Sequence, residues 1–385
     1  MIPYSKQNIS ENDVKEVVRI LNSDFLTQGP QTPLFEKAVS KYCNVNYATV
    51  VNSATSALHI ACKALGLKKG DVLWTSPNSY VSSANCALFC NAEVDFVDIN
   101  PLTYNLCPDS LEKKLSKAKK SNRIPKIVIP VHFAGQSCDM KKIRELADHY
   151  NFKIIEDASH AIGGKYLNKK IGACDFSDIT VFSFHAIKII TTGEGGLATT
   201  NNLDLFTKMQ LFRNHGVTRN IDLMTKRQEG KWYYEQIDLG YNYRITEFQA
   251  ALGMSQLRKI NESIKKRHIL KKRYDNLLKN LPIIVPFQSK DNYSSLHLYP
   301  IQIKRNLSNV SRLKLFNQLI EAGIGVNVHY IPIHTQPHYK KMGFKDGDFP
   351  ISEAYYKNAI SLPIFPNMSL QDQDKVVDVL IKAFQ

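Results

Sequence analysis

The sequence predicts an α/β fold with a large domain, built on a mostly parallel mixed sheet between helices, and a smaller C-terminal α+β domain. The chain has 385 residues and is 43% hydrophobic, which is enough for two domains or for one large domain with an appendage. From about residue 47, short apolar runs alternate with helical stretches, as in a parallel sheet covered on both faces. The pattern changes after a long helical stretch, and we place the boundary within that stretch, with the large domain at 1–255 and the small domain at 256–385.

The first expected element is a helix that follows Ser10, because Ser10 and Asp13 resemble a capping box. Apolar residues then repeat at helical spacing, at Val14, Val17, Val18 and Leu21. Strands are expected at Ala48–Val51, Val72–Thr75, Val94–Val97, Ile127–Val131, Lys153–Glu156, Ile179–Ser183 and Gly196–Thr199. Helices are expected between them at Ser56–Ala64, Ser83–Asn91, Met140–Tyr150 and Leu203–Arg213. Ligands bind at the carboxyl ends of such strands, so the candidate site lies in the loops that follow them.

The second half of the chain begins with one long expected helix, Thr246–Leu278. A smaller set of elements follows, with strand-like segments at Leu296–Ile303 and Gly325–His329 and helices at Ser311–Ala322 and Leu370–Phe384. This order is typical of a compact α+β domain.

The net charge is +15, concentrated at Lys113–Arg123 and Arg258–Arg273. Nucleic-acid binding would be one explanation, but these runs lack interleaved aromatic residues and no known binding motif is present. We interpret them as solvated helix faces that favour anionic substrates, and we expect no nucleic-acid partner.

We expect a cytoplasmic protein with no membrane partner, because no apolar run approaches the length of a membrane span and residues 1–10 lack a signal-peptide pattern. The seven cysteines are scattered, which suits reduced thiols. Cys86 and Cys90 are one helical turn apart, and we assign them to packing rather than to a metal site.

Lys188 is the strongest single indication of function. It lies in the stretch SFHAIK and is followed by the turn TTGEGG. A primary amine beside such a turn can form a Schiff base with a flat, phosphorylated aldehyde cofactor. Taken alone, a lysine next to glycines is more often a solvated surface residue. The interpretation therefore depends on the other groups that the chemistry requires.

Those groups follow other strands of the expected sheet. The segment 52–58, NSATSAL, opens a helix with small and hydroxylated residues, so its amides are free to bind a phosphate. Asp157 ends a buried strand, where its carboxylate can pair with a protonated pyridine nitrogen. Tyr80 follows another strand and could stack on a flat ring, and Ser183 could give a hydroxyl to the phosphate. Taken alone, each motif has an ordinary structural explanation. The segment 52–58 could be a simple helix N-cap, Asp157 could bond to loop amides, and Tyr80 could be a packed core residue.

Together these segments resemble the sugar aminotransferases of the DegT/DnrJ/StrS family, and the resemblance covers nearly the whole chain. The matching pieces are LTQGP at 26–30, NSATSAL at 52–58, EDASHAIGG at 156–164, FSFHAIKIITTGEGG at 182–196, RNHG at 213–216, LGYNYRITEFQAALGMSQL at 239–257, HLYP at 297–300 and VHYIPIH at 328–334. Several ordered motifs of this length are highly specific. The resemblance implies the type I fold of enzymes that use pyridoxal 5'-phosphate.

The resemblance also implies roles for the candidate residues. Lys188 would hold the cofactor aldehyde and act as general acid and base, and Asp157 would hold the pyridine nitrogen. Tyr80 would stack on the ring. The phosphate would be bound by Ser183, Ala54, Thr55 and, from the neighbouring subunit, Asn242. A homodimer with shared active sites follows from this last role.

Two positions depart from the family pattern. His160 stands near the cofactor's phenolic oxygen, where much of the family has Gln, and Ile187 precedes the lysine, where many members have Thr. Relatives that carry His in place of the lysine are dehydratases, so the presence of Lys188 favours transamination.

The closest resemblance is to the subgroup that aminates C4 of a UDP-linked 4-keto-6-deoxy-N-acetylhexosamine, with L-glutamate as donor, on the route to pseudaminic acid. Its motifs here are NSATSALHIA, DASHA, SFHAIKIITT, GYNYR and GIGVNVHY. Candidate substrate contacts are Tyr4, Thr27, Gln28, Arg244, His329 and Tyr330. The alternatives are another UDP- or dTDP-linked 4-keto or 3-keto sugar, a dehydratase, and a regulatory protein without enzymatic activity.

Overall fold

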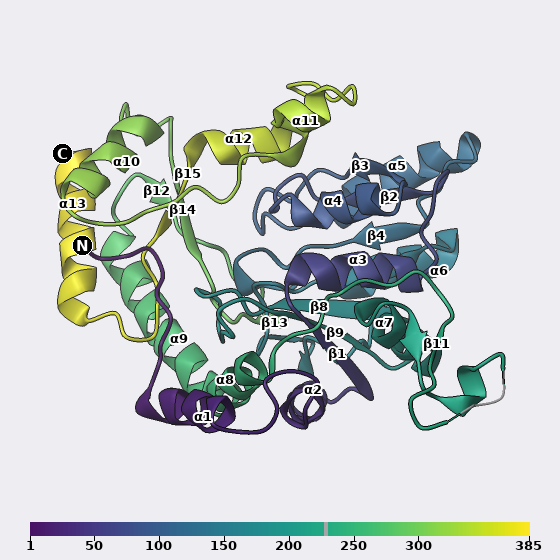
Figure 1. Ribbon diagram of the computed structural model, residues 1–385. Coiled ribbons are helices and arrows are strands. Elements are labelled where there is room, and N and C mark those ends of the chain that lie inside the picture. Colours follow the sequence, from purple (N-terminus) through teal and green to yellow (C-terminus); the bar gives the residue numbers. More distant parts are fainter. Residues whose placement is uncertain (227–229) are drawn as a thin grey trace.

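The computed structural model describes residues 1–226 and 230–385, and its centre is a seven-stranded sheet between layers of helices (Figure 1). The strand order is β1-β9-β8-β5-β4-β2-β3. These strands are β1 (Tyr47–Val51), β2 (Val72–Thr75), β3 (Glu93–Phe96), β4 (Ile127–Ile129), β5 (Lys153–Asp157), β8 (Ile179–Ser183) and β9 (Gly196–Thr200). Strands β3, β2, β4, β5 and β8 pair in parallel, and β9 joins β8 and β1 antiparallel, so the sheet is mixed but mostly parallel as predicted.

Helices cover both faces of this sheet. One face packs against α3 (Ala54–Ala64), α4 (Ser82–Phe89) and α7 (Leu203–Arg213), and the other packs against α5 (Pro108–Lys120) and α6 (Met140–Tyr150). Neighbouring side chains of one strand point to opposite faces of the sheet, so Leu73 packs in the core on the first face and Trp74 in the core on the second. Further along the sheet, α2 (Gln31–Cys43) and α8 (Glu247–Arg258) cover β1, β8 and β9. Both faces are therefore buried, which explains the near-continuous apolar strands.

The C-terminal part forms a second core around a three-stranded sheet of order β12-β14-β15. Its strands are β12 (Ile283–Ile284), β14 (Tyr299–Ile303) and β15 (Ala359–Leu362), and its helices are α9 (Ile260–Leu278), α10 (Arg312–Glu321) and α13 (Leu370–Phe384). Ile2 also packs in this core and forms a bridge with Ile324. The division at residue 255 stays a prediction.

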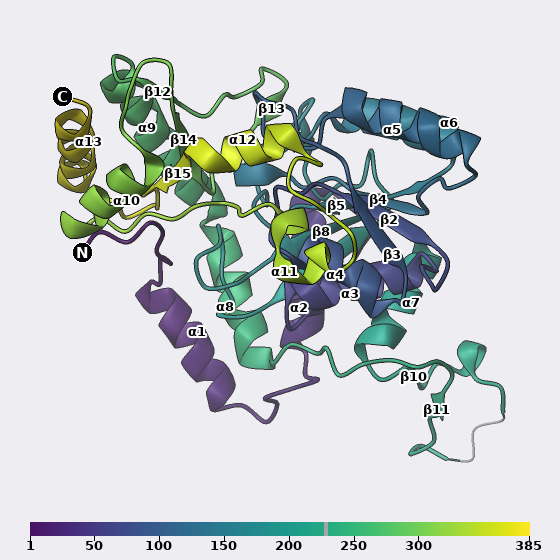
Figure 2. The same ribbon diagram turned by 90° about the horizontal axis from the view of Figure 1, so that it is seen from above.

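Helix α1 (Glu11–Leu21) lies near the start of the chain. The shorter elements are α11 (Pro337–Lys340), α12 (Pro350–Asn358), β6 (Lys165–Tyr166), β7 (Lys169–Lys170), β13 (Asn292–Tyr293), η1 (Phe133–Gly135), η2 (Ile221–Leu223) and η3 (Ile333–Thr335). Strands β10 (Val217–Thr218) and β11 (Glu235–Gln236) form a ribbon that projects from the body (Figure 2). The capping box of α1 is present as predicted, with Ser10 and Asp13 bonded reciprocally.

Three sequence-based expectations were wrong in detail. The expected helix 246–278 is two helices, α8 and α9, that meet at the non-helical Lys259. The expected strand Gly325–His329 is reduced to one bridge, Asn327 to Ser361. Strand β14 begins only at Tyr299, because Leu296 has a left-handed backbone (φ 53°) that interrupts extended pairing.

Arg267 corrects the view that the basic run on α9 is a solvated face. Its side chain is fully buried and donates to the carbonyls of Leu296, His297 and Ile364 at 3.1, 3.3 and 2.9 Å. Burial lowers the pKa of Arg267 to about 10. This arginine is therefore a structural cross-link within the C-terminal core.

Cys86 and Cys90 pack in the first core, in agreement with their assignment to packing. Over residues 1–226 and 230–385, no cluster of His, Cys, Asp or Glu has the arrangement of a metal site. Within the same residues, every helix is too short or too polar to cross a membrane.

Candidate active site

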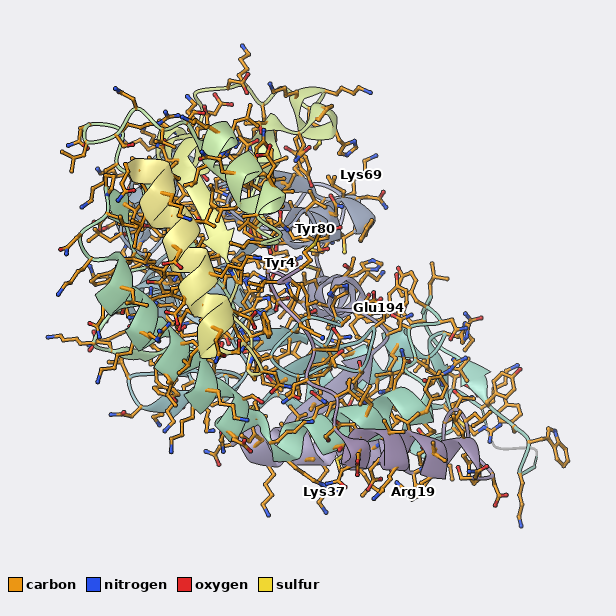
Figure 3. All side chains as sticks on the ribbon, turned by 90° about the vertical axis from the view of Figure 1, so that its left-hand side faces the viewer. Tyr4, Arg19, Lys37, Lys69, Tyr80 and Glu194 are labelled. Carbon is orange, nitrogen blue, oxygen red and sulfur yellow. The ribbon has the colours of Figure 1, made fainter. Side chains whose placement is uncertain are left out.

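A cavity of about 700 Å³ opens at the carboxyl ends of the parallel strands, between the large sheet and the C-terminal core. Its wall comes from the N-terminal segment, the start of α3, the β2–α4 loop, the ends of β5 and β8, and residues 327–331. Tyr4, Tyr80 and Glu194, which are labelled near the middle of Figure 3, all line this cavity although they are far apart in sequence. Arg19 and Lys37 lie away from it on the outer surface.

Most predicted cofactor and substrate residues meet here. The wall includes Tyr4, Ala54, Thr55, Tyr80, Asp157, His160, Ser183, Lys188, His329 and Tyr330. These residues are up to 326 positions apart in the sequence (Tyr4 to Tyr330). They meet only because the chain folds so that their segments reach the same edge of the sheet.

The start of α3 forms the anion-binding part of the cavity. Ser53 is the N-cap and accepts a hydrogen bond from the amide of Ser56 at 3.1 Å. In the described part of the chain, no acceptor is found for the amides of Ala54 and Thr55, which begin the helix. These two free N–H groups at the positive end of a helix suit a phosphate.

Gly196 allows β9 to approach this turn closely. A Cβ atom at position 196 would collide with the backbone of Ser53 and Ala54. Glycine at the start of β9 therefore lets the helix start sit directly against the sheet.

Asp157 lies at the end of β5 with both carboxylate oxygens engaged. Oδ2 accepts from the hydroxyl of Ser83 at 2.6 Å, and Oδ1 accepts from the amide of Ser159 at 3.1 Å. The residue is buried, and each oxygen keeps a further lone pair for a ligand. This arrangement fixes the orientation of the carboxylate in the cavity wall.

Lys188 lies in the loop between β8 and β9, and its side chain reaches the cavity. Loss of hydration lowers the pKa of Lys188 to about 8, although the nearby Asp157 carboxylate opposes that shift. A lysine with this pKa can lose its proton near neutral pH, as a nucleophile or a proton carrier must.

Three histidines lie close enough to Lys188 to feel its charge: His160, His297 and His329. His160 is buried, its Nε2 lies 3.1 Å from the hydroxyl of Tyr330, and its ring lies 4.5 Å from that of His297. Burial and the charge of Lys188 hold the pKa of His160 and His297 well below the ordinary value, and burial lowers that of His329 to about 3. These three rings are therefore neutral at physiological pH and can only donate or accept hydrogen bonds.

Four predicted residues do not enter this cavity within one chain. Asn242 is exposed and pairs with Asn214 through a bridge, and Thr27 is exposed beside Thr246. Gln28 and Arg244 line a second hollow of about 570 Å³, where Arg244 donates to Asn214 at 2.7 Å. These residues form a separate surface that borders Asn242.

Sequence reasoning missed several cavity residues, among them Ser79, Ser83, Asn327 and His297. Ser83 was assigned only to the start of a helix, although its place three residues after Tyr80 is a signal that could have indicated it. His297 stands in the quoted motif HLYP but carried no predicted role.

The residues present fit pyridoxal phosphate. The two unpaired amides of α3 and Ser183 match its phosphate, the Asp157 carboxylate matches its ring nitrogen, and the Lys188 amine matches its aldehyde. The exposed ring of Tyr80 at the cavity rim supplies a flat apolar surface for the cofactor ring.

Comparison with known proteins supports the same conclusion. Residues 7–381 match the DegT/DnrJ/EryC1/StrS aminotransferase family. A Campylobacter jejuni protein named UDP-4-amino-4,6-dideoxy-N-acetyl-beta-L-altrosamine transaminase is 39% identical over 388 residues, covering 100% of this chain and 98% of its own length.

Two solved structures resemble the whole chain. Helicobacter pylori PseC, described as an aminotransferase involved in the biosynthesis of pseudoaminic acid, has a TM-score of 0.91 and 33% identity, covering 100% of this chain and 99% of PseC. The PLP form of the putative sugar aminotransferase Spr1654 from Streptococcus pneumoniae has a TM-score of 0.88 and 29% identity, with 100% of both chains covered.

Proposed function

Because the chain belongs to the DegT/DnrJ/EryC1/StrS aminotransferase family, and is a sugar aminotransferase that uses pyridoxal phosphate, we propose a specific reaction for it. It transfers the amino group of L-glutamate to C4 of a UDP-linked 4-keto-6-deoxy-N-acetylhexosamine. The product is UDP-4-amino-4,6-dideoxy-N-acetyl-β-L-altrosamine, for pseudaminic acid synthesis. The observation that carries the chemistry is the meeting of Lys188, Asp157 and the free amides of α3 in one cavity. The names of the relatives support the substrate.

Bound pyridoxal phosphate supplies an aldehyde carbon that carries nitrogen and a ring that takes up electrons. Lys188 would hold that carbon at rest until the donor's amino group displaces it. The freed, neutral amine of Lys188 would then be the base that takes the proton from the donor's α-carbon, and in the second half of the reaction the acid that delivers a proton to C4 of the sugar. One base with a pKa of about 8 can do both, because it exchanges protons easily near neutral pH.

The other residues position the reactants. Asp157 would pair with the ring nitrogen, and the amides of Ala54 and Thr55, with Ser183, would bind the phosphate. Tyr80 would stack on the ring, and neutral His160 would be available as a hydrogen-bond partner. Tyr4, His329 and Tyr330, which also line the cavity, are proposed to contact the sugar.

We further propose a homodimer in which each site is completed by the partner. Asn242 lies outside the cavity of its own chain, on an exposed strip next to the second hollow. In a dimer, Asn242 would reach the cofactor phosphate of the other subunit, and Thr27, Gln28 and Arg244 would approach the nucleotide. Arginine suits a diphosphate because its planar fork donates two parallel hydrogen bonds.

Mixed dimers test this sharing. Lys188→Ala and Asn242→Ala proteins are each expected to have little activity, whereas a mixture that exchanges subunits should regain about one quarter of wild-type turnover. Half of the dimers would be mixed, and each mixed dimer has one site with both native residues. The measurement is turnover against mixing ratio after subunit exchange. Activity that stays at the sum of the two parents would argue against a shared site.

The substrate is tested by a coupled assay with glutamate and a panel of UDP- and dTDP-linked keto sugars. The UDP-linked 4-keto-6-deoxy-N-acetylhexosamine is expected to give the highest kcat/KM, and NMR of the product fixes the configuration at C4. A preference for a dTDP-linked or 3-keto sugar would replace the proposed substrate. Release of water without amination would indicate a dehydratase.

The pH dependence of cofactor uptake follows from the Lys188 pKa. Only the neutral amine attacks an aldehyde, so uptake by the cofactor-free protein should rise about tenfold per pH unit below pH 8 and level off above about pH 8. The measurement is the growth of visible absorbance after mixing with pyridoxal phosphate, with Lys188→Ala as the blank. A rate that keeps rising to the ordinary lysine value of 10.5 would contradict the lowered pKa.

A further inference from the structure

The start of helix α4 carries two adjacent serines that touch opposite ends of the candidate cofactor site. The Ser82 hydroxyl lies 2.8 Å from the Thr55 hydroxyl, at the phosphate turn. The Ser83 hydroxyl lies 2.6 Å from Oδ2 of Asp157, at the end of β5. Because α4 also packs into the first core, this helix end fixes the phosphate turn relative to the carboxylate.

The direction of the hydrogen bonds around Ser83 is determined by its chemistry. A carboxylate has no proton to give, so Ser83 must donate its single proton to Asp157. The Ser79 hydroxyl lies 2.7 Å from that of Ser83, and Ser79 must therefore donate to Ser83. Ser79 and Ser83 are both buried. The result is a one-way chain, Ser79 to Ser83 to Asp157, in which each donor strengthens the next.

We propose that Ser83 is a positioning residue for the reaction: its hydroxyl keeps the Asp157 carboxylate charged and in one orientation, so that Asp157 can hold the proton on the cofactor's ring nitrogen. A hydrogen bond donated to a carboxylate favours its charged form. Without Ser83, the Ser159 amide is the one remaining protein donor to Asp157 within the described residues. The proton would then shift from the ring nitrogen towards Asp157, and the ring would take up electrons less well. This inference rests on the proposed role of Asp157.

The test compares Ser83→Ala with Ser83→Thr, which keeps the hydroxyl, and with Ser352→Ala. Ser352 is equally buried, but its hydroxyl has no partner in the described part of the chain and it does not line the cavity, so this variant measures the cost of losing a buried hydroxyl elsewhere. Three quantities are measured: the affinity of the cofactor-free protein for pyridoxal phosphate, the pH at which the visible absorption of the bound cofactor changes, and kcat and KM for the glutamate half-reaction alone. The half-reaction needs no sugar, so a wrong sugar assignment would not affect the outcome.

Ser83→Ala is expected to lower kcat of the half-reaction by about ten- to a hundredfold, the range for one hydrogen bond to a charged group, while KM changes little. The absorption midpoint should move and cofactor affinity should fall, and Ser83→Thr should restore all three. Ser79→Ala should shift the same quantities in the same direction by less, and it serves as the second variant if Ser83→Ala does not fold. The proposal is overturned if Ser83→Ala, or Ser79→Ala in its place, matches Ser352→Ala in absorption midpoint and kcat.

Discussion

Replacement of Lys188 by alanine is expected to lower kcat/KM for amino transfer by at least about 10⁴-fold, the largest effect of any single substitution considered. Lys188 supplies both the amine that holds the cofactor and the base that moves the proton. It is also the one lysine among the described residues that line the cavity, so no neighbour can replace it. The protein should lose its visible absorbance at the same time.

The fold should survive this change. A buried amine costs hydration, and that cost is the reason for its lowered pKa, so its removal should not destabilise the protein. Thermal unfolding followed by circular dichroism checks this point. Lys69→Ala, at an exposed lysine that does not line the cavity (labelled in Figure 3), is the matched control and should keep full turnover and colour. A coloured, active Lys188→Ala protein would remove the basis of the mechanism.

Asp157→Asn is expected to reduce kcat by about 10²- to 10³-fold, because the ring nitrogen loses its anionic partner. The amide also fits the site poorly. Both carboxylate oxygens accept protein hydrogen bonds, from Ser83 and Ser159, and an asparagine has one oxygen for these two donors. Ser83 can rotate its hydroxyl, so we expect the amide nitrogen to face Ser83.

The control for this substitution is Asp178→Asn. Asp178 caps the amide of Ile154 in the same strand at 2.9 Å and pairs with Lys153, but it lies outside the cavity. It should change thermal stability slightly and leave kcat unchanged. Turnover of Asp157→Asn close to that of Asp178→Asn would refute the pyridine-nitrogen role. The absorption spectrum distinguishes two causes of low turnover. A variant that has lost only the carboxylate charge still shows the visible absorbance of bound cofactor, and a variant that no longer binds the cofactor does not.

Much of the large domain could be predicted because its signals are local. The seven strands of the main sheet were expected close to their observed bounds, since each is a short apolar run between turn residues. The same logic placed Asp157 and Lys188 at one sheet edge, because parallel strands end together. The capping box of Ser10 and Asp13 likewise depends on residues only three positions apart.

The residues that sequence reasoning missed depend on distant contacts. Ser83 matters because its hydroxyl meets a strand 74 positions away, and His297 because its ring meets His160. The sequence around Ser83 and His297 gives no sign of these contacts with Asp157 and His160. The break between α8 and α9 at Lys259 could not be predicted either, because no proline or glycine marks it in the sequence and a second helix follows it directly. The predicted subunit contacts of Asn242 depend on a second chain.

Arg267 has a consequence for how the molecule comes apart. Its guanidinium joins α9 to residues 296–297 and to Ile364, so the opening of any one of these segments would leave a buried cation with fewer partners. That penalty is on the order of several kcal/mol, and it links the three segments into one cooperative unfolding unit. The cavity wall that contains His297 therefore shares the stability of the C-terminal core, although His297 itself belongs to a connecting segment rather than to a strand.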